Sequence, residues 1–263
     1  MSGLIRSDFY RVFKSKLGIV SVILTVLFPL LTAALFRLIR EIGYSIAEDA
    51  GPMIDLALNA FTLIASSFSF TNNIGLILPV FAAILVMTDI SSGTVRNKII
   101  QGHSRYSIYA SHFIVSMTYC VGLIAVYVAL TAGFGVAFLG NQMLDGVSVE
   151  SLVYFYVLGG LCFAFVASVA TCMSLLTLNN AGAILLTLLV CMGFGLFSSL
   201  LVALVDDETA LHVLRFIPSY VVTEFQMGGI TPVMFLEGLG GTLLFSGAFY
   251  ALGTFSFAHR DLK

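Results

Sequence analysis

Runs without charge dominate the pattern of hydrophobic and polar positions along the chain. Residues 17–36, 56–88, 106–144, 151–205 and 238–259 contain no Asp, Glu, Lys or Arg. A transmembrane helix needs about 20 apolar residues, so each run is long enough to cross a bilayer. The run 106–144 is too short for two crossings and a turn, and it predicts one long helix. The run 151–205 is too long for one crossing, and its interruption at Asn179, Asn180 and Gly182 predicts a helical hairpin.

Six transmembrane helices follow from these runs. We expect them at approximately 17–38, 66–88, 106–138, 152–178, 181–205 and 233–257. The composition agrees, because 59% of the residues are hydrophobic and only 10% are charged, whereas soluble domains carry roughly 25% charged residues. We find no repeat and no low-complexity tract. The sequence therefore predicts an all-α integral membrane protein with a single transmembrane domain over residues 1–263.

The positive charges indicate which side of the membrane each loop occupies. An even number of spans places both termini on one side, and cytoplasmic loops carry the excess of Lys and Arg. Nine of the 12 Lys and Arg residues fall on the side of the termini: Arg6, Arg11, Lys14, Lys16, Arg96, Lys98, Arg105, Arg260 and Lys263. We therefore expect both termini in the cytoplasm. The first apolar stretch is expected to remain as a span, because it is too long for a signal peptide and no small-residue cleavage site follows it.

Residues that most enzymes require are missing. No lysine follows a glycine, so the sequence lacks a phosphate-binding loop for ATP, and neither a zinc-protease nor a serine-hydrolase motif occurs. The four histidines lie on four separate segments, and the four cysteines lie inside predicted spans without a Cys-x-x-Cys pair. We therefore expect a protein that is not an enzyme and that binds no metal or cofactor of its own.

Carboxylates are also absent from the centres of the predicted spans. An ion-driven transporter normally keeps an ionisable group at that depth. Glu237 lies one turn into the last span, and we interpret it as a wetted or paired residue at the outer edge. His112, near the start of the third span, is interpreted as an interfacial group. An ion-coupled carrier is therefore disfavoured.

The N-terminal segment has the pattern of a helix that lies in the inner membrane interface. Apolar side chains recur at helical spacing while the basic ones face elsewhere: Leu4, Ile5, Phe9, Val12 and Phe13, against Arg6, Lys14 and Lys16. A simple basic flank of the first span is the alternative interpretation.

The loop 89–105, between the second and third spans, is the longest polar stretch on the inner side. It predicts a short helix, with Asp89, Ser91 and Ser92 as possible caps and Gly102 as its stop. Ser104 is expected to cap the third span. We expect Val95, Ile99 and Ile100 on one side of this helix, and Arg96 and Lys98 on others. Such a capped, amphipathic and basic helix is suited to docking a cytosolic partner.

Several segments together resemble the permease subunits of ATP-binding-cassette type-2 exporters. They are the loop 89–105, the segment 7–16 ahead of the first span, and the closing segment 259–263. In the loop, the resemblance identifies a set of residues that couple the membrane part to an ATPase: Asp89, Gly93, Thr94, Arg96, Lys98, Ser104 and Arg105. It implies two permease chains, identical or paralogous, in a bacterial plasma membrane with two soluble ATPase subunits. ATP and Mg would bind to the ATPase, and no nucleic acid would be involved.

The resemblance also implies a partly inserted helical segment on the outer side between the fifth and sixth spans. Residues 211–225 fit it, with Pro218 as a break. In the family the second and fifth spans commonly line the path. The corresponding residues here are Asn72, Asn73, Phe194, Phe197 and Ser198. The alternative is that small residues in these spans only pack helices together. Two such packing seams are expected, at Gly160, Ala164 and Ser168 and at Gly247 and Ala251.

The function expected from the resemblance is the membrane-spanning subunit of an ATP-driven exporter. Its cargo would be a peptide or another amphipathic or hydrophobic compound, since the segments are similar to those of peptide-export and lantibiotic-immunity permeases. The alternative is a membrane scaffold or sensor subunit that transports nothing. An intramembrane enzyme is a third hypothesis, and the missing catalytic motifs weaken it.

Overall fold

The structure is a computed structural model that describes residues 2–46, 60–71, 73–140, 149–204, 208–228 and 230–259. These residues form α-helices joined by turns, with no β-strand among them. The helices are α1 (Ser2–Lys14), α2 (Lys16–Ile46), α4 (Ala60–Ser66), α5 (Asn73–Ser91), α6 (Thr94–Ile100), α7 (Arg105–Leu139), α8 (Val149–Thr177), α9 (Asn180–Leu204), α10 (Glu208–Leu214), α11 (Tyr220–Gly228) and α12 (Pro232–His259).

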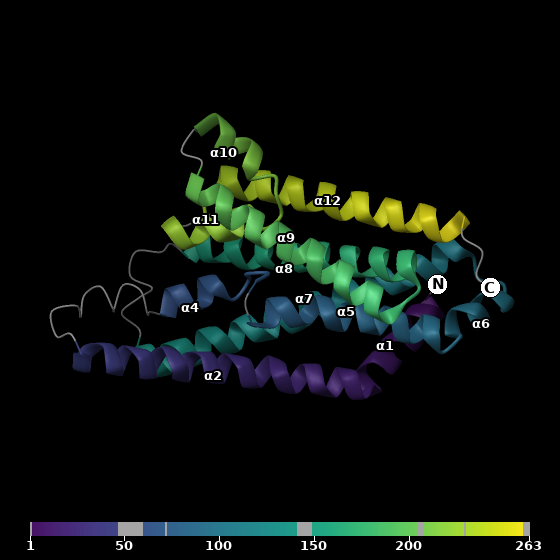
Figure 1. Cartoon of the computed structure of the whole chain (residues 1–263), viewed down its shortest axis with the longest axis horizontal. Coiled ribbons are helices and arrows are strands. Elements are labelled where there is room, and N and C mark those ends of the chain that lie inside the picture. The colour runs from purple at the N-terminus through teal and green to yellow at the C-terminus, as the bar shows by residue number, and fades with distance from the viewer. Residues whose placement is uncertain are drawn as a thin grey trace.

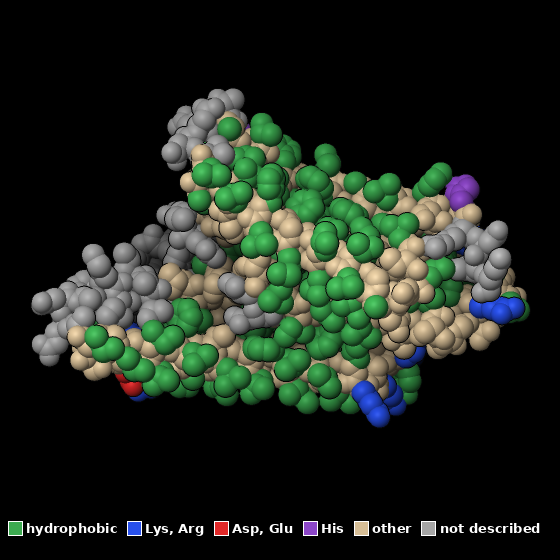
Figure 2. Space-filling view, viewed as in Figure 1, with side chains coloured by type: hydrophobic (Ala, Val, Ile, Leu, Met, Phe, Trp, Pro, Cys, Tyr) green, Lys and Arg blue, Asp and Glu red, His purple; other side chains and the backbone are tan. Residues whose placement is uncertain are grey.

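Six of the described helices are long and apolar enough to cross a membrane, which confirms the expected all-α membrane protein. They are α2, α5, α7, α8, α9 and α12. Figure 1 shows them running along one bundle, with α1 and α6 at one end and α10 at the other. We call these the α6 end and the α10 end. Figure 2 shows hydrophobic side chains spread along the visible face of the bundle, whereas soluble proteins rarely expose such large apolar patches.

The predicted helix boundaries hold best where a glycine or an asparagine interrupts the sequence. The run 151–205 is a hairpin, as expected: Leu178 has a φ of 52° between α8 and α9, and the Asn179 Oδ1 accepts a hydrogen bond from the Ala181 N–H at 3.1 Å. The predicted start of the second span, at residue 66, was wrong, because α4 ends at Ser66 and α5 begins only at Asn73. Polar side chains between these helices bond to the local backbone instead of continuing the helix. The Ser69 hydroxyl, for example, accepts from the Thr71 N–H at 3.3 Å.

Helix α8 is the centre of the bundle. It packs against α5, α7, α9 and α12, and its aromatic side chains meet those of the turn between α4 and α5. The Phe70 ring lies edge-on to the Phe163 ring with centroids 5.5 Å apart. Such edge-to-face pairs add roughly 0.5–1.5 kcal/mol to the burial of the rings themselves. The turn at residues 67–71 is therefore part of the core of the protein.

Close packing of α12 depends on glycines other than the expected one. A Cβ atom on Gly247 would have nothing within 4 Å, and Ala251 is exposed, so the predicted seam at these two residues is wrong within this chain. The close approaches occur at Gly241, where a Cβ would lie 1.9 Å from the Phe216 carbonyl oxygen, and at Gly253, where it would lie 2.0 Å from the Tyr109 hydroxyl. Helix α12 therefore meets α7 at the α6 end, at the level of Gly253.

Candidate functional site

The short helix α6 is the most distinctive element at the α6 end. It begins after Gly93, whose φ of 69° is left-handed, and it ends before Gly102, whose φ is 87°. Two hydrogen bonds close its last turn: the Gly102 N–H donates to the Ile99 carbonyl at 2.9 Å and the His103 N–H to the Lys98 carbonyl at 3.2 Å. This is the Schellman arrangement in which glycine ends a helix, and it confirms the predicted stop at Gly102.

The expected caps at the start of α6 were wrong. Gly93 occupies the N-cap position and no side chain bonds to the first turn. Ser91 belongs to α5, and the Ser92 hydroxyl lies 2.7 Å from the Thr94 hydroxyl. Asp89 points into the protein instead. The chain therefore passes from α5 to α6 through the left-handed conformation that glycine adopts readily, and not through a polar side chain that caps α6.

The chain that leaves α6 starts α7, and the start of α7 is tied to the end of α12. Ser104 caps α7 as predicted, with its hydroxyl accepting from the Ser107 N–H at 3.2 Å. The Arg105 guanidinium donates to the Ala258 carbonyl oxygen at 3.1 Å, near the end of α12. Basic groups are favourable at the carbonyl end of a helix, where the backbone dipole is negative. This hydrogen bond joins the start of α7 to the end of α12.

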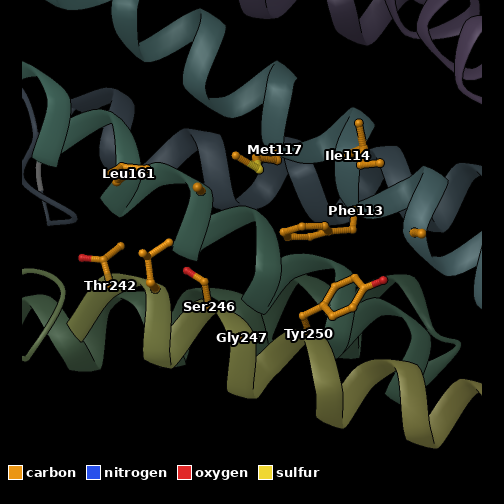
Figure 3. A pocket seen from close by; sticks show the side chains of 11 residues that line it. Phe113, Ile114, Met117, Leu161, Thr242, Ser246, Gly247 and Tyr250 are labelled. Atoms are coloured by element: carbon orange, nitrogen blue, oxygen red, sulfur yellow. The ribbon is translucent and has the colours of Figure 1, made fainter. Parts of the chain in front are cut away.

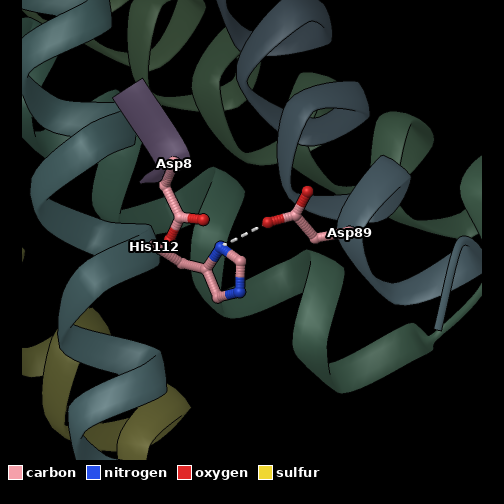
Figure 4. A group of neighbouring side chains, drawn as sticks. All are labelled: Asp8, Asp89 and His112. Carbon is pink, nitrogen blue, oxygen red and sulfur yellow. Dashed lines mark ion pairs between the residues drawn. The ribbon is translucent and has the colours of Figure 1, made fainter. Parts of the chain in front are cut away.

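A buried group of charged residues lies beneath α6. We call it the charge cluster, and it consists of Asp8, Arg11, Asp89, Lys98 and His112. The Lys98 ammonium donates to both oxygens of Asp8, at 2.8 and 2.9 Å. The Arg11 guanidinium pairs with Asp8 at 3.3 Å and also with Asp89. Figure 4 shows Asp8, Asp89 and His112 converging from three helices, with the His112 Nδ1 atom 3.4 Å from Asp89 Oδ2.

Burial makes this cluster unusual. The exposed fractions are 3% for Asp8, 1% for Asp89, 6% for Lys98 and 1% for His112. Removing a charge from water costs several kcal/mol unless it is paired, and here two carboxylates face two cations. The Ser111 hydroxyl adds a hydrogen bond to Asp8 at 2.9 Å. The cluster therefore fastens α1, α5, α6 and α7 to one another at a single point.

Asp8, Asp89 and His112 are residue types that commonly bind metal ions, but the net charge of the cluster does not favour a metal ion. One ligand atom each from Asp8, Asp89 and His112 lie within 4.8 Å of one another. Carboxylate oxygens and imidazole nitrogens are common metal ligands. However, Lys98 and Arg11 already balance the two carboxylates, and a divalent cation would add two positive charges to a buried and neutral group. The arrangement therefore suits an ion-pair network better than a metal centre.

The faces of α6 differ from the sequence-based expectation. Val95 and Lys98, three residues apart, both point inwards, whereas Arg96 is exposed and Ile100 is 74% exposed. The prediction that Ile100 shares a side with Val95 was wrong. An aspartate on α1, distant in sequence, provides the partner that makes burial of Lys98 favourable. Of the two cations on α6, Arg96 alone faces outwards.

The residues expected along a translocation path do not all share one surface. Asn72 and the side chain of Asn73 lie outside the described residues. Phe194 and Phe197 line a groove of about 590 Å³ between α9 and α12. Ser198 turns to the interior, where its hydroxyl donates to the Phe194 carbonyl at 2.7 Å and bonds to the Ser219 hydroxyl. The structure thus groups the two phenylalanines and separates Ser198 from them.

A second set of charges lies at the α10 end. It consists of Arg215, Glu224, Glu237 and His212, and we call it the Arg215 cluster. Two hydrogen bonds, of 2.8 and 3.0 Å, join the Arg215 guanidinium to Glu224. These bonds raise the pKa of Arg215 above its ordinary value, while partial burial opposes them. Glu237 lies 2.6 Å from the His212 Nδ1 atom and 3.6 Å from the Arg215 guanidinium, so it is a paired residue, as one of its two interpretations expected.

The helical segment expected between the last two spans is present. Residues 211–225 fall on α10 and α11, and the turn between them contains Pro218, which confirms the predicted break. Tyr220, Val221 and Val222 are buried at the start of α11. Helix α11 packs on α4, α8, α9 and α12.

Asp8 is the functional candidate that the sequence pattern did not identify. It lies between Leu4 and Val12 at spacings of four residues, so it shares their buried face of α1. A carboxylate in the centre of an apolar stripe was the available signal. Similarly, His112 is buried, although we expected an interfacial group.

Comparison with known proteins gives a family but no described relative. The sequence profile of the family described as "Protein of unknown function (DUF2705)" matches residues 23–262, so the chain belongs to this family. No protein with a curated description matches the chain.

Proposed function

We propose that this chain is the membrane-spanning subunit of an ATP-driven exporter of the ATP-binding-cassette type-2 class. In this proposal the α6 end faces the cytoplasm of a bacterial cell, and α6 docks on a soluble ATPase. Two permease chains, identical or paralogous, form the path for a peptide or another amphipathic or hydrophobic compound. ATP and Mg bind to the ATPase.

The observation that carries the proposal is the anchoring of α6 by the charge cluster. A connection between two spans needs only a few residues, yet here it forms a helix whose Lys98 side chain is paired with Asp8 on α1 and Asp89 on α5. A displacement of α6 would therefore move the end of α5 and the start of α7 together. This is the mechanical property that a coupling element needs, because packed elements transmit strain as rigid bodies.

The outward face of α6 supports the same proposal. Arg96 and Ile100 are four residues apart and both exposed, so they lie on one side of the helix. An arginine beside an apolar side chain suits a protein groove with an acidic rim, since arginine is enriched at interfaces. The groove along Phe194 and Phe197 would meet a second permease chain or the cargo.

The test is charge reversal on α6 with a matched control on α1. Arg96→Glu should reduce co-purification of the soluble Walker-type ATPase that the proposal expects to be encoded beside the gene, because it places an acidic group on the docking face. Arg6→Glu makes the same change at an exposed residue at the same end of the bundle, and it should leave co-purification unchanged. Equal loss in both variants, or no loss in either, would contradict docking through α6.

Transport separates the exporter from a scaffold or sensor. The permease and the ATPase, reconstituted together in vesicles, should move an amphipathic peptide only when ATP is hydrolysed. Stable binding of the ATPase without any movement of cargo would instead support the scaffold.

A further inference from the structure

The corner between α1 and α2 carries exposed positive charges beside exposed aromatic rings. Lys14 ends α1, Lys16 begins α2, and both side chains are exposed. Tyr10 and Phe13 are 62% and 68% exposed. Phe13 and Lys14 follow Tyr10 by three and four positions, so the three residues share one side of α1. We call Tyr10, Phe13, Lys14 and Lys16 the basic corner, and Figure 2 shows Lys and Arg side chains gathered there, beside the start of α2.

No carboxylate balances the charges of the basic corner. Lys14 and Lys16 form no ion pair among the described residues. The Lys14 ammonium lies 4.6 Å from the centroid of the Tyr10 ring, which attracts a cation without neutralising it. Asp8 is the one acidic residue of α1, and it is buried with Lys98 as its partner. The basic corner therefore presents a net positive charge to whatever covers it.

The turn that forms the basic corner is fixed by its own hydrogen bonds. The Ser15 hydroxyl donates to the Val12 carbonyl oxygen at 2.7 Å and accepts from the Gly18 N–H at 2.9 Å. A Cβ atom on Gly18 would collide with the Val12 carbonyl oxygen, so glycine permits this close approach of α1 and α2. Val12 itself is buried in the bundle. Lys14 and Lys16 therefore lie on either side of a rigid turn.

The basic corner lies at the depth of lipid headgroups. Ile19, three residues after Lys16, is 55% exposed, and the exposed apolar face of α2 continues through Val22 and Ile23. Three residues of an α-helix rise about 4.5 Å, and the headgroup layer is roughly 5–7 Å thick on each side of the hydrocarbon core. Lys16 is therefore level with the headgroups when the apolar face of α2 lies in the hydrocarbon. Exposed tyrosines are also typical of this depth.

The middle of the bundle has no comparable charges. Figure 3 shows the groove between α7, α8 and α12, into which Phe113 and Met117 project from α7. None of the described residues that line this groove is an Asp, Glu, Lys, Arg or His. Its walls offer no charge by which one lipid could be selected over another. Selection by charge is therefore expected at the basic corner and not along this groove.

We propose that the basic corner binds the headgroup phosphates of anionic phospholipids, in the membrane leaflet at the α6 end. Lys14 and Lys16 contact the phosphates, while Phe13 lies against the first carbons of the acyl chains. A lysine close to an anionic membrane contributes about fivefold to the affinity. The site requires only that α2 crosses a bilayer, so it stands or falls separately from the docking of an ATPase on α6.

The first experiment identifies the lipids that the full chain retains in detergent by native mass spectrometry. The probe is an equimolar mixture of phosphatidylglycerol and phosphatidylcholine with acyl chains of different mass. The unsubstituted chain should retain mostly phosphatidylglycerol. The double variant Lys14→Gln with Lys16→Gln should lower this preference at least fivefold, whereas Lys14→Arg with Lys16→Arg should preserve it.

The matched control is Arg37→Gln, which removes an exposed cation that Glu41 already balances at 2.9 Å. It should leave the preference for phosphatidylglycerol unchanged. Equal retention of the two lipids by the unsubstituted chain would overturn the proposal. An undiminished preference in the folded glutamine variant, recognised by its monodisperse elution peak, would do the same.

A second experiment measures the depth of the basic corner with a single tryptophan. The chain contains no Trp, so Phe13→Trp introduces the one indole fluorophore. In phosphatidylglycerol vesicles, a nitroxide on the lipid headgroup should quench it more strongly than a nitroxide near the end of the acyl chain. Leu27→Trp, at a 43% exposed residue of α2, should show the opposite order. If neither nitroxide quenches Phe13→Trp, the corner does not touch the membrane and the proposal fails.

Discussion

The two ends of the bundle use similar residues in different surroundings. The charge cluster at the α6 end joins four helices through side chains that are almost fully buried, apart from Arg11. The Arg215 cluster at the α10 end joins the turn after α10 to α11 and α12, and its His212 side chain is 56% exposed. Ion pairs in water contribute little to stability, whereas removal of one partner from a buried pair is strongly destabilising. Arg215 is itself only 9% exposed, so the difference lies in what each helix contributes. Helix α6 contributes the buried Lys98 and is fixed firmly, whereas α10 contributes the exposed His212 and is fixed weakly.

The largest effect is expected from Lys98→Met. It leaves two buried carboxylates facing one cation, which should lower the free energy of unfolding by about 3–5 kcal/mol. Thermal unfolding of the purified protein in detergent would measure this. The double variant Asp8→Met with Lys98→Met restores the charge balance and should recover most of the loss. If Lys98→Met unfolds at the same temperature as the unsubstituted protein, the cluster does not hold α6.

An intermediate effect is expected from Arg215→Met. Two charge-assisted hydrogen bonds to Glu224 are lost, and Glu224 remains in a partly buried place. The expected cost is about 1–3 kcal/mol. A destabilisation as large as that of Lys98→Met would show that both ends of the bundle are fixed equally firmly, which would contradict the difference proposed here between the two clusters. Proteolysis near the α10 end would show whether the loss is local.

The smallest effect is expected from His212→Ala. Its exposed pair with Glu237 should contribute less than about 1 kcal/mol and should weaken further at high salt. Unfolding curves at low and high ionic strength would measure the contribution of the pair to stability and its dependence on salt. The exposed pair between Arg37 and Glu41, 2.9 Å apart on α2, is the matched control and should behave alike. A strong dependence on His212 alone would indicate a fixed structure at the α10 end.

The sequence predicts the architecture well because hydrophobic length is a local property. The hairpin at Asn179 and the stop at Gly102 follow from residues that interrupt a helix wherever they occur. The start of α5 was harder, since Ser, Thr and Asn side chains before it compete for the backbone without a fixed outcome. The packing seam at Gly247 failed because a glycine permits close approach but does not require it.

The charge cluster could not be predicted in the same way. Asp8 and Lys98 are 90 residues apart, and helical periodicity describes only one helix at a time. A cation in a short polar loop is normally solvated, so Lys98 was expected outside. The direction of Lys98 depends on where α1 packs, which is a tertiary property. Exposure of Arg96 and Ile100 follows from the same packing, because Lys98 fixes the rotation of α6.

Photo-crosslinking from α6 in intact cells tests the central claim most directly. A benzoylphenylalanine in place of Ile100 should form an adduct with the soluble Walker-type ATPase, and Arg96→Glu in the same chain should reduce it. Ile46 at the far end of α2 is likewise exposed, and the same substitution there should form no ATPase adduct. Adducts from residue 100 that contain only lipid, or ATPase adducts of equal yield from residue 46, would contradict an exporter subunit that docks its ATPase through α6.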